Sequence, residues 1–143
     1  MADIAEFLTA RWGEEQAAAE AAVPEGGTGR WEVNGSTSCY IVDADDTDEI
    51  TIYDEGGHSP RQAQHIALHD PARVLADLEA KRAILARVAE DAAIAWSPRA
   101  QAVPDCDWHL IAMARDVLKL LVQPYREHPD FDRAWSVGVE TSG

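Results

Sequence analysis

The sequence has few of the features that mark secreted or membrane-bound proteins. Its 143 residues include only two cysteines, Cys39 and Cys106, and their separation matches no disulfide framework. No charged and then apolar leader opens the chain, and no apolar run approaches the roughly 18 residues that a membrane-spanning helix requires. We therefore expect a cytoplasmic protein with free thiols and no contact with a membrane.

Basic residues are also scarce. Lysine and arginine number 12 against 26 aspartates and glutamates, so the formal net charge is −14. Phosphate backbones repel such a surface, which argues against direct binding to nucleic acid. The acidity favours solubility and still allows a basic protein partner.

The remaining composition is that of a folded protein. Hydrophobic residues make up 46% of the chain and charged residues 27%, which lies outside the range of disordered sequences. A chain of this length can bury one core without disulfides or metals, so we expect a single α+β domain over residues 1–143.

The first half of the chain predicts a helix followed by a small sheet. Apolar residues recur at helical spacing from Ile4 to Trp12, after an Asp3/Glu6 pair that resembles a capping box, and an alanine-rich run continues to Ala22. The segments "RWEV", "CYIV" and "EITIY" are rich in β-branched and aromatic residues. They predict a three-stranded antiparallel meander, with Asn34-Gly35 in its first turn.

The second half predicts three helices. Ser59, Pro60 and Gln62 form the signature of a helix start, and Pro71 must end that short helix near His69. Asp70 then becomes the N-cap of a long helix that runs to about residue 95, and a last helix ends before residue 124. We expect these two long C-terminal helices to pack on the sheet, and the aromatic tail to dock by its rings.

His65 and His69 are the most informative candidates for a metal site. Their i, i+4 spacing places two imidazoles on one helical face, and Cys106 and His109 add a C-x-x-H pair. The four side chains would make a tetrahedral zinc site if they converged. No glutamate follows the first histidine, however, and the cysteine pair of a typical zinc finger is missing, so we favour a hinge in which His69 ends one helix and expect no cofactor.

Two acidic or glycine-rich loops resemble ligand sites only in part. Asp43, Asp45 and Asp54 match ligand positions of the calcium-loop template, but the sequence lacks the central glycine and the final glutamate that this template requires. A solvated hairpin loop explains them better. The turn "DEGGHSP" is typical of a strand-to-helix connection that can cradle an anion, but it matches no phosphate-binding fingerprint.

The segments "HIALHDPARVL", "PYREHPDFDRAW" and "IAEFLTARWGEEQAAA" together resemble an uncharacterised family, a domain of unknown function, of small proteins from actinobacteria and their phages. The resemblance implies a compact accessory protein, which would act in the host cytosol if phage-encoded. It implies no activity and no catalytic residue.

From these observations we expect a non-enzymatic protein-binding module, with an oligomeric state that the sequence leaves open. The side chains most suited to contact a partner are His65, His69, Asp70, Arg73, Tyr125 and His128. The alternative is a small-ligand or zinc-binding protein, or a weak enzyme, that uses His65, His69 and their neighbours. If capping is the whole role of Asp70, then Asp70→Asn should leave stability nearly unchanged.

Overall fold

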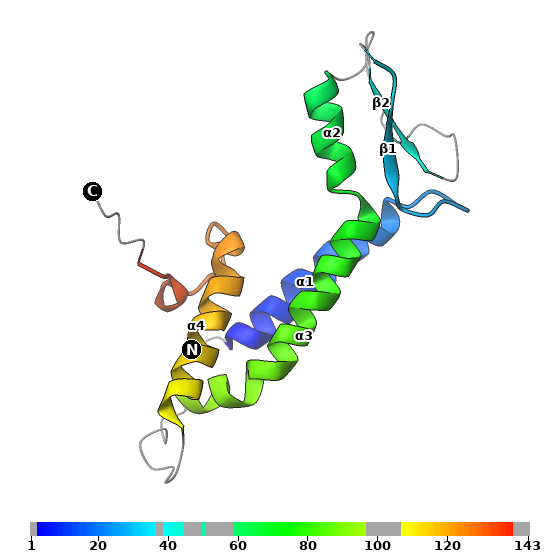
Figure 1. The fold of residues 1–143 in the computed structure, drawn as a ribbon. Helices are drawn as coiled ribbons and strands as arrows, with labels where there is room; N and C mark the ends of the chain where they lie inside the picture. The colour runs from blue at the N-terminus through cyan, green and yellow to red at the C-terminus, as the bar shows by residue number, and fades with distance from the viewer. Residues whose placement is uncertain (1–2, 37–38, 45–49, 51–58, 97–106, 139–143) are drawn as a thin grey trace. The chain divides into compact units, whose positions relative to one another are not determined.

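A computed structural model describes residues 3–36, 39–44, 50, 59–96 and 107–138. In chain order the elements are α1 (Ile4–Ala21), β1 (Trp31–Asn34), β2 (Tyr40–Asp43), α2 (Pro60–Leu68), α3 (Pro71–Trp96) and α4 (Trp108–Val122), followed by the short 3-10 turns η2 (Gln123–Tyr125) and η3 (Arg133–Trp135) (Figure 1). The α+β class is therefore confirmed. In the described part of the chain, no helix is both long and apolar enough to cross a membrane.

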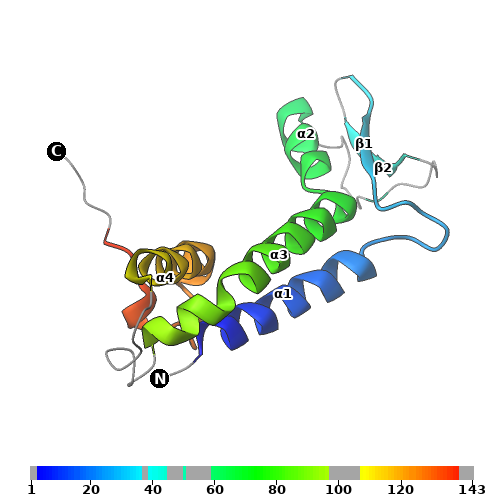
Figure 2. The same ribbon diagram turned by 60° about the horizontal axis from the view of Figure 1, so that its bottom comes forward.

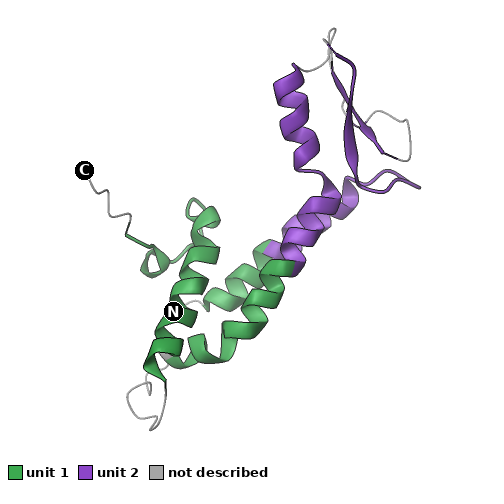
Figure 3. Cartoon of the chain, in the orientation of Figure 1, with its two compact units in different colours: residues 1–11, 80–143 green, residues 12–79 purple. Residues whose placement is uncertain are grey.

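The chain divides into two compact units (Figure 3). Unit 1 comprises residues 1–11 and 80–143, and unit 2 comprises residues 12–79. Unit 2 holds fifteen acidic residues against three arginines, a net charge of −12, whereas unit 1 holds eleven acidic against nine basic residues, a net charge of −2. The acidity of the protein is thus concentrated in unit 2. The single domain expected from the chain length stays a prediction.

Unit 2 is built around an antiparallel hairpin. β1 pairs with β2 from Trp31↔Asp43 to Asn34↔Tyr40, and Gly35 enters the turn with a φ of 98°, as the Asn-Gly pair predicts. The short helix α2 lies along this hairpin in both ribbon views (Figures 1 and 2). Ala63 of α2 packs with Cys39 and Ile41 in the small core between them, where Cys39 is a buried free thiol.

The predicted third strand and the predicted helix cover of the sheet are not confirmed. Of the segment "EITIY" only Ile50 lies within the described residues, and its N–H donates to the Ile41 carbonyl at 2.7 Å. The helix that packs on the two described strands is α2, although we expected the two long helices there. A nine-residue helix is long enough, because a four-residue strand pair offers it only a short apolar face.

The helix boundaries follow the local signals in the sequence. Ser59 and Gln62 form a complete capping box at the start of α2, and Asp3 accepts hydrogen bonds from the Ala5 and Glu6 amides at the start of α1. His69 caps the end of α2, with its N–H donating to the Ile66 carbonyl. These capping predictions are confirmed.

In unit 1 the aromatic tail docks on the first residues of α1. Phe7 lies 5.2 Å from the Trp135 ring and 6.1 Å from the Tyr125 ring, centroid to centroid. Trp135 is 1% exposed, and its carbonyl accepts a hydrogen bond from the Gln123 side chain. The predicted docking of the tail by its rings is thus confirmed. One face of α4 is also buried, through Ile111, Ala114, Leu118 and Val122.

Asp43 corrects the expectation of a solvated acidic loop. Its side chain is 2% exposed, and its carboxylate accepts hydrogen bonds from the Thr28 N–H, the Thr28 hydroxyl and the Gly29 N–H at 2.9 to 3.1 Å. The carboxylate therefore fastens the glycine-rich loop after α1 to the end of β2. The sequence places Asp43 beside other acids, but its hydrogen-bond donors lie 14 and 15 residues away. Asp45 and Asp54 lie outside the described residues.

We expect Asp43→Asn to lower the free energy of unfolding by about 2 kcal/mol, because an amide group would turn a donor toward the loop amides and leave a buried N–H unsatisfied. Glu32→Gln is the matched control, since Glu32 is exposed on β1 and the change removes the same charge. The measurement is urea unfolding followed by circular dichroism. Equal losses for the two variants would contradict the structural role of Asp43.

Candidate functional site

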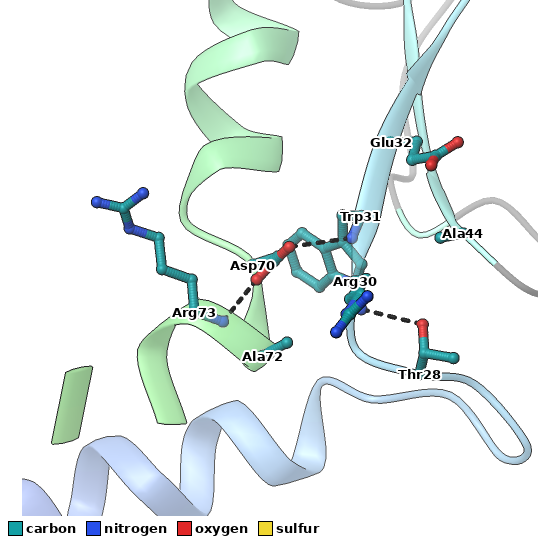
Figure 4. Close-up of a pocket in the computed structure, with 8 residues that line it drawn as sticks. All are labelled: Thr28, Arg30, Trp31, Glu32, Ala44, Asp70, Ala72 and Arg73. Atoms are coloured by element: carbon teal, nitrogen blue, oxygen red, sulfur yellow. Dashed lines mark hydrogen bonds between the residues drawn. The ribbon is translucent and has the colours of Figure 1, made fainter. Parts of the chain in front are cut away.

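The junction between α2 and α3 is organised by the carboxylate of Asp70. One oxygen accepts a hydrogen bond from the Arg73 N–H at 2.7 Å, which caps the first turn of α3. The other accepts from the Trp31 N–H at 3.2 Å, at the first residue of β1 (Figure 4). The predicted cap is confirmed, and the same side chain also ties the helix to the hairpin.

A second hydrogen bond joins the same two segments. The Ala72 N–H donates to the Gly29 carbonyl at 3.0 Å. Gly29 has a φ of +71°, and a Cβ there would lie 3.0 Å from the Val23 side chain, so any other residue would strain the backbone and crowd Val23. Pro71 has no N–H, and the Arg73 and Val74 amides are bonded to the side chain and the carbonyl of Asp70, so the amides at the start of α3 are all bonded within the chain. They are not available to bind an anion.

An open pocket of about 1010 Å³ lies at this junction. It is lined by Thr28, Arg30, Trp31, Glu32, Ala44, Asp70, Ala72 and Arg73 (Figure 4). Arg30 and Arg73 are two of the three arginines of the acidic unit 2. Figure 4 shows their guanidinium groups pointing in different directions. The pocket therefore offers two separate cations and no convergent clamp for a single phosphate or carboxylate.

His65 and His69 lie side by side at the end of α2. Their ring centroids are 4.7 Å apart with an interplanar angle of 60°, and both side chains are exposed. His109 belongs to unit 1, where it is exposed in the first turn of α4, and Cys106 lies outside the described residues. The structure places the histidine pair together within unit 2, and the four-ligand zinc site stays a hypothesis. Among the described residues, no three of His, Cys, Asp and Glu gather closely enough to hold a metal ion.

Tyr125 and His128 lie together in unit 1. The His128 ring packs edge-on against Phe7 at 5.4 Å, forms a hydrogen bond with Arg11 and accepts another from the Asp130 N–H at 3.1 Å. Tyr125 contacts the same Phe7 ring. These contacts hold the tail in place, and a role for either side chain in binding a partner stays a prediction.

Sequence reasoning missed a second apolar face on α4. Six large apolar side chains are exposed among the described residues, and four of them belong to this helix: Trp108, Leu110, Met113 and Leu120. The signal was present, because an apolar residue recurs at positions 110, 113, 117 and 120 in addition to the buried positions. Periodicity alone does not say which of these positions stay exposed.

Comparison with known families identifies the family of the chain. The family of unknown function DUF6221 matches residues 1–137. The chain therefore belongs to this family. No curated protein and no solved structure matched the chain.

Substitutions of Asp70 measure the bridge between helix and hairpin. Asp70→Asn keeps one carbonyl acceptor but loses the other, so we expect the free energy of unfolding to fall by about 1 kcal/mol, and by about 2 kcal/mol for Asp70→Ala. This revises the nearly neutral effect expected from capping alone. Glu79→Gln, an exposed change on α3, controls for the lost charge. Denaturant unfolding of the three variants gives the values, and an unchanged Asp70→Asn would reduce Asp70 to a cap.

Proposed function

We propose that this chain is a non-enzymatic protein-binding module and that its contact surface is the exposed apolar face of α4. The observation that carries the proposal is the exposure of Leu110, Met113 and Leu120, whose exposed fractions are 47%, 56% and 62%. Val117, which is half-buried, lies between them. Together these four residues are called the α4 stripe.

The spacing of the α4 stripe suits contact with another helix. Its residues follow one another at intervals of three, four and three, which is the pattern of a helix–helix seam. They lie on a different side of α4 from the buried residues Ile111, Ala114 and Leu118, since each residue advances about 100° around a helix. The helix thus has one apolar face for its own unit and a second one in water.

Exposing an apolar stripe of this kind to water is unfavourable, and a partner that covers it would gain binding free energy. Fully burying one valine, leucine or methionine side chain contributes roughly 1.5–3 kcal/mol, and the four residues of the α4 stripe are already partly covered, so covering them supports a weak to moderate contact. A single helix of 15 residues spans about 22 Å, which limits the contact area and favours a transient complex.

The partner that best fits this surface is an amphipathic helix with basic flanks. The apolar side of such a helix would cover the α4 stripe, and its positive charges would be attracted over a longer range by the net charge of −14, most of which lies in unit 2. The resemblance to small actinobacterial and actinophage proteins supports an accessory protein that acts on a cellular partner.

The test is selection of helical peptides from a random library on the immobilised chain. We expect enrichment of amphipathic, basic sequences, and we expect Met113→Glu combined with Leu120→Glu to weaken their binding by at least about tenfold, which equals 1.4 kcal/mol. Fluorescence polarisation measures the affinity. Stability should stay nearly unchanged, because both side chains are exposed.

Trp108→Glu is the matched control. Trp108 is a large apolar residue that is 47% exposed on the same helix, but it lies away from the α4 stripe, so peptide binding should survive. Sedimentation velocity of the free chain adds a second readout. A dimer that the double variant abolishes would assign the α4 stripe to self-association, and equal peptide binding by all variants would remove the stripe from the contact. Either result would overturn the proposal.

A further inference from the structure

The geometry points to a metal-binding site at the end of α2: we propose that His65 and His69 chelate a late first-row divalent cation through their two imidazoles. Residues four apart on a helix lie on the same face, and here the ring centroids are 4.7 Å apart. Two imidazoles in this arrangement can supply two nitrogen ligands to one metal ion.

The donor atoms of the pair are available. Both side chains are exposed, and within the described part of the chain neither ring forms a hydrogen bond or an ion pair. A metal would therefore replace only water at the ring nitrogens. This distinguishes the pair from His128, whose ring is engaged by Arg11 and by the Asp130 amide.

The backbone holds the two rings in a defined relation. His65 lies in the last turn of α2, and His69 is the residue that caps it, with its N–H bonded to Ile66. The next residue, Asp70, is fixed from both sides by the Arg73 and Trp31 amides. Little conformational freedom of the backbone is left to lose, which favours chelation over binding by single histidines.

Charge and ligand type select the cation. Unit 2 carries a net charge of −12, which raises the local concentration of divalent cations. Imidazole nitrogen prefers copper, nickel and zinc to magnesium and calcium, and copper(II) has the highest affinity of the series. With two protein donors, the remaining coordination positions are open to water or to a donor from another molecule.

The experiment is isothermal titration calorimetry of the untagged full chain with Ni²⁺, Cu²⁺ and Zn²⁺. Mg²⁺ and Ca²⁺ serve as negative controls. We expect one equivalent of Ni²⁺ to bind. His65→Ala and His69→Ala should each weaken it by at least about tenfold, the loss that even an outer-shell substitution produces. The melting temperature should rise with Ni²⁺ in the parent chain and in neither variant.

The sharpest control keeps the composition and changes the spacing. Gln64→His combined with His65→Gln moves the first histidine one position, so the pair becomes i, i+5 and leaves the shared face; residues 64 and 65 are both exposed, so the fold should tolerate the exchange. This variant should bind as weakly as His65→Ala. Binding equal to that of the parent would show adventitious contact with single histidines only and would overturn the proposal.

Two further variants define the ligand set. Cys106→Ser and His109→Ala should bind Ni²⁺ and Zn²⁺ as the parent does, because the proposed site takes its protein donors from His65 and His69 alone. If either substitution weakens binding as much as His65→Ala, the metal has protein ligands besides His65 and His69, and the two-histidine assignment is wrong. Absence of binding by the parent chain would also refute it.

Discussion

The two-sided hydrogen bonding of the Asp70 carboxylate is the constraint on which the architecture of unit 2 depends. One oxygen accepts from the Arg73 N–H at the start of α3 and the other from the Trp31 N–H at the start of β1, while the Gly29 carbonyl accepts a hydrogen bond from the Ala72 N–H in the first turn of the same helix. A helix start normally leaves backbone amides for water or a ligand. Here the chain uses its own groups, so the "HDP" segment connects helix and hairpin, and the backbone amides at the start of α3 are not left for an anion.

The two units differ in the surface properties that could serve recognition of a ligand or partner. Unit 2 carries most of the net charge and an exposed histidine pair, which suits attraction of cations or basic surfaces. Unit 1 is almost neutral and has an apolar helix face in water, which suits contact with another apolar surface. Long-range attraction and short-range contact are therefore supplied by different parts of one small chain.

Sequence reasoning predicted the features that depend on neighbours within about four residues. The capping box at Ser59, the cap at Asp70 and the end of α2 at His69 are all local hydrogen-bond patterns, and each is confirmed. Burial of Asp43 was missed because it depends on a loop 14 and 15 residues away. The side of α4 that stays in water was missed because periodicity gives the number of apolar positions but not how many of them find a neighbour.

The hydrogen bonds of Asp43 and Asp70 also bear on the way unit 2 opens. The loop before β1 is held by a side chain at the end of β2, and β1 itself is held by a side chain between α2 and α3. If one of these segments detaches, backbone amides of another segment lose their hydrogen-bond acceptors. The amides of Thr28, Gly29, Trp31 and Arg73 should therefore exchange their hydrogens slowly and at similar rates, because they become exposed in one cooperative opening. They would do so even though they belong to a loop, a strand and a helix.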